Sequence, residues 1–170
     1  MQQTAKQLKL LALDVDGVLT DGRIYYDSAG GEFKAFNIKD GLGIKLLQRD
    51  GVEVAIITGR ESPMVTRRAT ELGITAIIQG REDKLSALES LCADKNITLA
   101  KCAYMGDDLP DLAAIRAAGL GLTVSDAANP VREAADWVAS LAGGTGAVRE
   151  ACEMILALRE SLQTVTGEFN

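Results

Sequence analysis

The feature that most constrains this fold is the alternation of short, wholly apolar runs with longer segments of helical periodicity. Strands that are apolar throughout must be buried on both faces, and a helix after each strand returns the chain for parallel pairing. The pattern therefore predicts an α/β fold with a doubly wound parallel sheet, in a single domain of residues 1–170. The expected strands are Leu8–Val15, Val52–Ile57, Thr75–Ile78, Cys102–Met105, Gly121–Val124 and a short strand near Trp137 and Val138.

Helices are expected between these strands, and capping residues and glycines set their limits. Ser62 before Pro63 is the pattern of an N-cap followed by a first helical residue, and Gly73 ends that helix. The other expected helices are Leu42–Arg49, Glu82–Asp94, Pro110–Gly119, a short helix from Asn129-Pro130 and a long final helix over Gly146–Gln163.

One segment breaks the alternation. Two β-rich runs, Arg23–Tyr26 and Glu32–Phe36, are joined by Asp27-Ser28-Ala29-Gly30-Gly31, which predicts a β-hairpin over about residues 23–36. Because the hairpin comes soon after the first strand, we expect a protruding flap that covers a site at the end of that strand or contacts another subunit.

Composition and charge exclude several classes of protein. A net charge of −6 argues against a nucleic-acid-binding protein, which needs a basic face. The apolar runs are too short to cross a bilayer, and Asp14 interrupts the N-terminal segment before a signal peptide could develop, so we expect a cytoplasmic protein without a membrane partner. The chain has no histidine, which removes Ser-His and Cys-His nucleophiles and His-ligated zinc. The wide spacing of Cys92, Cys102 and Cys152 favours buried thiols over disulfides or a zinc site.

Polar residues follow the strand ends, where parallel sheets bind their ligands. Asp14 and Asp16 end the first strand, Thr58-Gly59-Arg60 follows the second, and Gly106-Asp107-Asp108 follows the fourth. Crowded carboxylates repel one another and lose solvation, so a cation is needed to offset the cost. Mg²⁺ prefers oxygen ligands, which the carboxylates of Asp14 and Asp107 and the backbone carbonyl of Asp16 would supply.

The same residues predict phosphoryl transfer through a covalent intermediate. Asp14 is placed to attack phosphorus. Asp16 is two residues further on and therefore on the same side of the strand, where it would act as general acid and then as general base. The Thr58 hydroxyl, the Gly59 amide and the Lys84 ammonium are donors for the phosphoryl oxygens.

Three other acids have more than one interpretation. Asp108 and Asp111 would position metal-bound water or Lys84, but an acid in a first helical turn, such as Asp111, also fits a simple helix-dipole role. Asp21 is either a turn residue before Gly22 or a residue that acts near the flap. The sequence leaves these choices open.

Four pieces in chain order resemble the haloacid dehalogenase superfamily of phosphotransferases: DVDGV at 14–18, TGR at 58–60, Lys84, and GDDLPD at 106–111. The resemblance implies a Rossmann-like fold. The interval from Gly22 to Thr58 has room only for the hairpin and one helix, which implies that no cap domain is inserted there.

A closer resemblance covers residues 8–160. The segments DVDGVLTDG, FNIKDGLGIKLL, AIITGR, QGREDKL, AYMGDDLPDL and GGTGAVRE are similar to those of the 3-deoxy-D-manno-octulosonate 8-phosphate phosphatase family. That resemblance implies a Mg²⁺-dependent phosphatase without a cap, acting on a small phosphorylated sugar acid in the route to the inner-core sugar of Gram-negative lipopolysaccharide. It also implies a homotetramer in which the hairpins assemble around the axis and a neighbouring subunit helps to close each site.

The family resemblance also implies which residues form the site. Its metal ligands fall on Asp14, Asp16 and Asp107. Several of its substrate contacts are cationic, which suits a substrate that carries a phosphate and a carboxylate. Lys45 and Arg68 also fit an ordinary solvated helix face. The substrate contacts fall on Asp16, Asn37, Ile38, Lys39, Asp40, Gly41, Lys45, Arg60, Arg68 and Lys84.

One position departs from the family pattern. Many members carry arginine where Thr145 stands in GGTGAVRE, so a sugar contact is in question, and a nine-carbon keto-deoxy sugar acid phosphate is an alternative substrate. A phospho-signalling receiver domain is a rival class, but its third strand would end in an acid, whereas Gln79-Gly80 follows that strand here. A non-catalytic oligomerisation domain is the other rival, and the intact acidic set argues against it.

Overall fold

The computed structural model describes residues 1–169 of the chain. Within this range six strands form one sheet in the order β5-β4-β1-β6-β7-β8, and every neighbouring pair is parallel. Each expected strand is therefore present, with ends that differ by a few residues. The strands are β1 (Leu10–Leu13), β4 (Glu53–Ile57), β5 (Ala76–Ile78), β6 (Cys102–Gly106), β7 (Leu120–Thr123) and β8 (Trp137–Val138).

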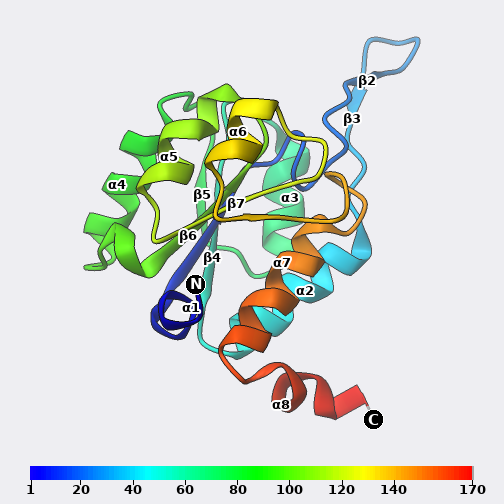
Figure 1. The fold of residues 1–170 in the computed structure, drawn as a ribbon. Coiled ribbons are helices and arrows are strands. Elements are labelled where there is room, and N and C mark those ends of the chain that lie inside the picture. The colour runs from blue at the N-terminus through cyan, green and yellow to red at the C-terminus, as the bar shows by residue number, and fades with distance from the viewer. Residues whose placement is uncertain (170) are drawn as a thin grey trace.

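Helices cover both faces of the sheet, as wholly apolar strands require. Figure 1 shows α2, α3 and α7 on one side of the sheet and α4, α5 and α6 on the other. The α/β fold with a doubly wound parallel sheet is therefore confirmed. The helices are α1 (Gln2–Gln7), α2 (Ile38–Arg49), α3 (Pro63–Glu71), α4 (Lys84–Asp94), α5 (Leu112–Ala117), α6 (Asn129–Ala134), α7 (Ala147–Leu158) and α8 (Leu162–Thr166), with 3-10 turns at Leu99–Lys101, Leu109–Asp111 and Gly167–Phe169.

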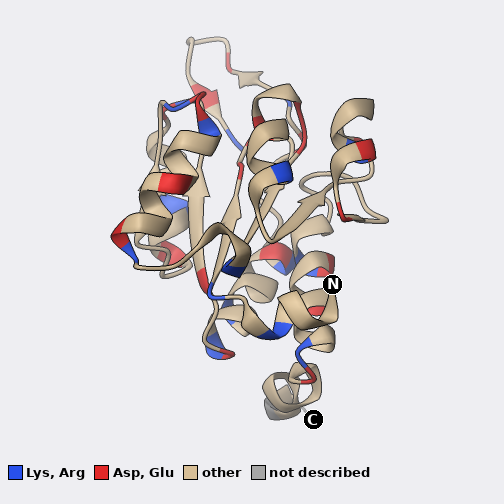
Figure 2. Cartoon of the chain, turned by 60° about the vertical axis from the view of Figure 1, so that its left-hand side comes forward, with Lys and Arg blue, Asp and Glu red and all other residues tan. Residues whose placement is uncertain are grey.

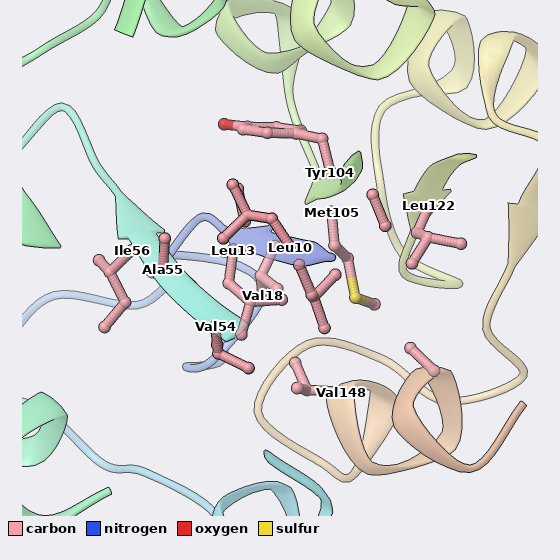
Figure 3. Packing of buried hydrophobic residues seen from close by; sticks show 14 of the residues in the cluster. Leu10, Leu13, Val18, Val54, Ala55, Ile56, Tyr104, Met105, Leu122 and Val148 are labelled. Carbon is pink, nitrogen blue, oxygen red and sulfur yellow. The ribbon is translucent and has the colours of Figure 1, made fainter. Parts of the chain in front are cut away.

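The core is one continuous cluster that includes both faces of the sheet. Residues along a strand alternate between faces, so the neighbours Tyr104 and Met105 on β6 point into opposite layers. Figure 3 shows Met105 on the same side of the sheet as Val148 of α7, and Tyr104 on the other side. Leu10 and Leu13 of β1 are fully buried. The central strand is therefore fixed by packing against both layers.

The chain order reverses at the centre of the sheet. From β1 the chain passes through α2 to β4 and through α3 to β5, then crosses to β6 on the other side of β1 and continues to β7 and β8. The carboxyl ends of β1 and β6 thus lie side by side at the switch point, where open α/β sheets bind ligands. The Asp14 amide donates to the Met105 carbonyl at 2.9 Å, which ties the two strand ends together.

The protruding hairpin is present, with shorter strands than expected. Strands β2 (Tyr25–Tyr26) and β3 (Glu32–Phe33) pair antiparallel. The rings of Tyr25 and Phe33 stack with their centroids 5.1 Å apart. Figure 1 shows the hairpin projecting beyond the carboxyl ends of the parallel strands. Between β1 and β4 the chain holds only this hairpin and α2, so no cap domain is inserted there.

Helix α2 begins at Ile38 rather than at the expected Leu42. Asn37 caps the helix by accepting a hydrogen bond from the Lys39 amide at 2.9 Å. Glycine is a poor helix former, but a Cβ at Gly43 would lie only 2.9 Å from the Cα of Arg149 on α7. The close approach of α7, which only glycine permits, thus offsets the low helix propensity of this segment.

The expected single helix over residues 146–163 is wrong, because α7 and α8 take its place. Helix α7 ends at Leu158, and Glu160 adopts a left-handed backbone with φ of 65°. The Ser161 amide then donates to the Leu156 carbonyl at 3.0 Å, which closes the helix end in the manner of a Schellman motif. Helix α1, which the sequence pattern did not predict, packs against α7.

Charged residues are dispersed over the chain. Figure 2 shows Lys and Arg interspersed with Asp and Glu rather than gathered on one basic face. None of the helices in the described residues combines the length and apolar character that a bilayer span requires. Cys92, Cys102 and Cys152 are free and buried, as expected, and serve as small core side chains.

Candidate active site

An acidic pocket of about 280 Å³ lies at the switch point. Its walls come from the ends of β1, β4 and β6 and from the first turn of α4, segments that are far apart in the sequence. Gly22, Gly59, Glu82, Asp108, Pro110 and Asp111 also line it. The pocket brings together these residues that the sequence predicted for the site: Asp14, Asp16, Thr58, Arg60, Lys84 and Asp107.

Lys84 is the centre of a buried ion cluster. Its Nζ lies 2.8 Å from Oδ2 of Asp14 and 2.8 Å from Oδ1 of Asp111. Asp111 also accepts hydrogen bonds from the Tyr104 hydroxyl at 2.7 Å and from the Asp107 amide at 3.1 Å. Asp111 therefore does more than face a helix dipole, because it fixes both the lysine and the loop after β6.

Burial perturbs the acids of this cluster. Burial, and then the charge of Asp111, raises the pKa of Asp14 to about 6, although Lys84 acts in the opposite direction. Burial, followed by the charges of Asp14 and Asp111, raises the pKa of Asp107 to about 7. Burial lowers the pKa of Lys84, but its two carboxylate partners outweigh burial, and the net shift is upward. The raised carboxyl pKa values mean that Lys84 alone does not compensate the ionised cluster.

The donor set of the cluster fits a divalent cation. One oxygen from each of Asp14, Asp107 and Asp111 lies within 4.8 Å of the other two. One ammonium neutralises only one of the three carboxylates, so two negative charges remain uncompensated. Oxygen donors are the ligands that Mg²⁺ prefers. The Asp16 side chain lies outside this group because it pairs with Lys34, which leaves its backbone carbonyl as the candidate ligand.

Gly17 makes the space that Asp107 occupies. Its φ of +93° is a conformation that side chains with a Cβ rarely adopt. A Cβ at this position would lie 2.1 Å from Oδ2 of Asp107. The turn after β1 therefore needs glycine both for its backbone and for the carboxylate that approaches it from β6.

Thr58 and Gly59 present donors to the acidic pocket. Thr58 is buried, its amide donates to the Ile78 carbonyl at 2.9 Å, and its carbonyl accepts from the Arg81 amide at 3.1 Å. Among the described residues, neither the Thr58 hydroxyl nor the Gly59 amide has a hydrogen-bond partner. These two groups are therefore available to the oxygens of a ligand in the pocket.

Glu32 and Lys34 contact the site but were not among the residues predicted from the sequence. Lys34, whose side chain is 2% exposed, pairs with Oδ1 of Asp16 and lies 3.8 Å from Oε1 of Glu32. Arg60 donates to both oxygens of Glu32, at 2.9 and 3.0 Å, and its Nε lies 4.0 Å from Oδ2 of Asp16. Glu32 and Lys34 are two residues apart in an extended segment, so their side chains lie on the same face. This spacing is the sequence pattern that could have indicated that the two act together.

A second pocket of about 290 Å³ is lined by the segment after β3 and by α3. Lys34 lines the second pocket and its ion-pair partner Asp16 lines the acidic one, so this pair connects the walls of the two pockets. Phe36, Met64, Arg67 and Glu71 line it as well. Of the predicted substrate residues it holds Arg68, which donates to the Asn37 carbonyl at 3.4 Å.

Two predicted substrate residues on the first turn of α2 contact the chain around α7. Asn37 Nδ2 donates to the Gly144 carbonyl at 3.3 Å. Asp40 is buried and accepts from the Arg149 amide at 2.8 Å, and burial raises its pKa. Thr145, the departure from the family pattern, follows Gly144 and is exposed.

The structure brings none of the predicted residues of this segment to either pocket, Asn37 and Asp40 included. Ile38, Lys39 and Lys45 are exposed on α2, and none of them lines the two pockets. Gly41 is buried, with its Cα facing the guanidinium of Arg68. One chain alone therefore leaves the predicted residues of this segment outside the acidic site.

Asp21 lies at the base of the hairpin. It accepts hydrogen bonds from the Tyr25 hydroxyl at 2.5 Å and from the Arg23 amide at 3.1 Å. The Tyr25 hydrogen bond is the main cause that lowers the pKa of this carboxyl. Asp21 therefore acts in this chain as a turn residue that anchors the hairpin.

Comparison with known proteins gives this chain relatives along almost its whole length. Residues 73–149 match a family described as haloacid dehalogenase-like hydrolase. A 3-deoxy-D-manno-octulosonate 8-phosphate phosphatase from Yersinia pestis is 44% identical over 165 residues, which cover 97% of this chain and 88% of that protein.

Solved structures are similar over the same extent. A 3-deoxy-D-manno-octulosonate 8-phosphate phosphatase from Moraxella catarrhalis, in complex with a magnesium ion, a phosphate ion and KDO, has a TM-score of 0.97 and 50% identity, covering 99% of this chain and 97% of that one. A cobalt-bound form of the Haemophilus influenzae phosphatase has a TM-score of 0.91 and 41% identity, covering 95% of each chain.

Proposed function

Because the chain belongs to the 3-deoxy-D-manno-octulosonate 8-phosphate phosphatase family of haloacid dehalogenase-like hydrolases, we propose that it hydrolyses this sugar phosphate to the free sugar acid and inorganic phosphate. The observation that carries the proposal is the acid cluster around Lys84 at the switch point. The proposal places the reaction in the cytoplasm, in the route to the lipopolysaccharide inner core.

In the first half of the reaction, a carboxylate oxygen of Asp14 attacks phosphorus and forms an aspartyl phosphate, while the bond from phosphorus to the sugar oxygen breaks. The leaving oxygen takes its proton from the Asp16 carboxyl. Lys84, held 2.8 Å from Asp14, stabilises the charge on the transferring phosphoryl group. The Thr58 hydroxyl and the Gly59 amide donate to the phosphoryl oxygens.

In the second half, a water molecule attacks the phosphorus of the aspartyl phosphate. Asp16, now a carboxylate, accepts the proton that the water loses. The bond between phosphorus and the Asp14 oxygen breaks, inorganic phosphate leaves, and both aspartates return to their starting states. One carboxyl group therefore acts as acid and then as base.

Asp14, Asp107 and the backbone carbonyl of Asp16 would hold Mg²⁺, with Asp111 as a further carboxylate of the same cluster. When bound, Mg²⁺ supplies the positive charge that lets an anionic nucleophile and an anionic phosphate approach each other. The chain's own contribution is to hold the carboxylates together, and the turn at Gly17 leaves Asp107 the space that it needs.

Two cationic side chains suit the two ends of the substrate. Arg60 lines the acidic pocket and Arg68 lines the second one. A substrate with its phosphate in the first pocket would extend its sugar acid toward the second, where Arg68 is positioned to receive a carboxylate. The exposed residues Ile38, Lys39 and Lys45 would then serve the site of a neighbouring subunit.

The assembly that this requires is a homotetramer built through the hairpin. Ile24, Tyr26 and Phe33 on the hairpin and Ile38 at the start of α2 are 49%, 68%, 51% and 80% exposed. Large apolar side chains that cluster on a protruding element are typical of an interface between subunits. Light scattering at working concentration tests this part of the proposal, and a monomer would contradict it.

The test of the activity is a side-by-side comparison of kcat/KM on the eight-carbon and nine-carbon keto-deoxy sugar acid phosphates. We expect Mg²⁺-dependent release of phosphate with the eight-carbon ester preferred. Asp14→Asn should lower kcat by about 10³-fold or more with unchanged circular dichroism. Asp94→Asn, an exposed acid on α4, is the matched control and should keep full activity.

Two outcomes would contradict the proposal. Preference for the nine-carbon ester would replace the substrate but keep the chemistry. Near wild-type turnover by Asp14→Asn would exclude the covalent mechanism.

A further inference from the structure

The hairpin places a buried cation directly on the proposed acid-base residue. Lys34 follows β3, and its side chain is 2% exposed, whereas that of Asp16 is 25% exposed. A lysine ammonium is rarely buried to this degree unless it is paired, and the partner of Lys34 is Oδ1 of Asp16. The buried ammonium of Lys34 is therefore held against the Asp16 carboxylate, which is the more exposed partner of the pair.

Glu32 and Arg60 complete a chain of charges around this pair. Oε1 of Glu32 lies 3.8 Å from Nζ of Lys34, and Arg60 holds both Glu32 oxygens at 2.9 and 3.0 Å. Arg60 Nε lies 4.0 Å from the second oxygen of Asp16. Both Asp16 oxygens thus have a cation on them or close by, and each cation also contacts Glu32.

The hairpin does not need this chain of charges for its own integrity. The stacked rings of Tyr25 and Phe33 and the hydrogen bond from the Tyr25 hydroxyl to Asp21 already hold its strands and its base. Lys34 lines one pocket and its partner Asp16 lines the acidic one, so the pair connects the pocket proposed for the phosphate with the pocket proposed for the sugar acid. With the substrate placed as proposed, a group paired with Asp16 acts on the leaving oxygen rather than on the ends of the substrate.

We infer that Lys34 is a positioning residue, which with Glu32 and Arg60 directs the Asp16 carboxyl at the leaving oxygen. This inference rests on the proposed function, because it assigns Lys34 a part in the same reaction. Lys34 acts through Asp16 and does not itself take or give a proton.

The experiment compares two phosphate esters that differ in their need for an acid. An alkoxide leaving group, as in the sugar phosphate, must be protonated as it departs, whereas 4-nitrophenolate leaves without help. For both esters kcat/KM reports the steps up to formation of the aspartyl phosphate. The variants are Lys34→Met, which keeps the length and apolar stem of the side chain, Lys34→Arg, which restores the charge, and Lys101→Met, an exposed control.

For Lys34→Met we expect kcat on the sugar phosphate to fall about 10²-fold, which is the size of a general-acid contribution, with KM within about threefold. Its kcat/KM on 4-nitrophenyl phosphate should stay within about threefold of wild type. Because Asp16 also serves as the base, a burst of nitrophenolate should appear before the steady state. Lys34→Arg should recover at least part of the lost kcat, and Lys101→Met should match wild type.

Three results would overturn the inference. Equal losses of kcat/KM on the two esters would show a general disruption, and a rise in KM with unchanged kcat would make Lys34 a simple substrate contact. Wild-type kinetics in Lys34→Met would leave it no role. If Lys34→Met does not fold, Glu32→Gln should show the same selective loss at about threefold to tenfold, and an unselective loss would overturn the inference instead. Wild-type hydrolysis of the sugar phosphate tests the proposed function separately.

Discussion

The acid cluster at the switch point should make the metal-free protein less stable as pH rises toward neutrality. In the folded chain the pKa of Asp14 is raised to about 6 and that of Asp107 to about 7, from an ordinary value of 3.8. At pH values between the ordinary pKa and the raised ones, the folded chain retains protons that the unfolded chain has lost. The free energy of unfolding therefore falls as pH increases through this range. The sign is opposite to that of a carboxylate stabilised by an ion pair.

The magnitude follows from the two shifted carboxyl groups. Between about pH 5 and about pH 7.5, Asp14 accounts for a loss of about 1 kcal/mol, and Asp107, discounted because it is partly exposed, for about 1–2 kcal/mol more. The window is clean because the chain has no histidine. The paired surface carboxylates with lowered pKa values, such as Asp83 and Glu71, titrate below it. Asp40, whose pKa burial raises, acts in the same sense as the cluster.

Urea denaturation followed by circular dichroism, with a chelator present, measures this dependence. We expect a higher free energy of unfolding at about pH 5 than at about pH 7.5, and added Mg²⁺ should stabilise the protein increasingly as pH rises because it binds the ionised carboxylates. Asp107→Asn should flatten the metal-free curve and raise it at neutral pH, whereas Asp94→Asn should leave it unchanged. A metal-free protein that is equally or less stable at the lower pH would refute the reasoning.

Two further substitutions test the packing that supports the site. Gly17→Ala should abolish the rise in Tm on adding Mg²⁺ and lower the stability by about 1–2 kcal/mol. The reason is that the alanine Cβ would lie 2.1 Å from Oδ2 of Asp107, at a backbone φ of +93°. A Tm shift on adding Mg²⁺ equal to that of wild type would contradict this. Asp40→Ala should lower the free energy of unfolding, measured in urea, by about 1–2 kcal/mol because the Arg149 amide loses its acceptor. Asp40→Asn keeps an acceptor oxygen and should retain most of the stability. Equal losses in the two variants would argue against the hydrogen bond as the cause.

Most of the sheet could be predicted because its signal is local. A run such as Leu10–Leu13 is apolar at every position, and burial on both faces is the only way to remove it from water. The positions of Asp14 and Asp107 after such runs are enough to predict both acids at the carboxyl ends of parallel strands. Their grouping with Asp111 required the register of β1 against β6.

The helix limits that were wrong depend on contacts distant in the sequence. Gly43 weakens the local helical pattern, and its reason for being there is the approach of Arg149 on α7. The end of α7 depends on a left-handed residue at Glu160, where no glycine gives a signal. Neither the glycine in α2 nor the left-handed residue after α7 can be predicted from the residues immediately around it in the sequence.

Sequence by itself determined the layered α/β architecture, the hairpin and the acids with their lysine, because periodicity and strand ends act over a few neighbouring residues. Only the tertiary structure decided which charges meet: that Asp111 holds Lys84, that Lys34 is buried against Asp16, and that Lys39 and Lys45 line neither pocket. The physical reason is that ionic interactions depend on distance and burial, which arise when segments far apart in the chain are packed together.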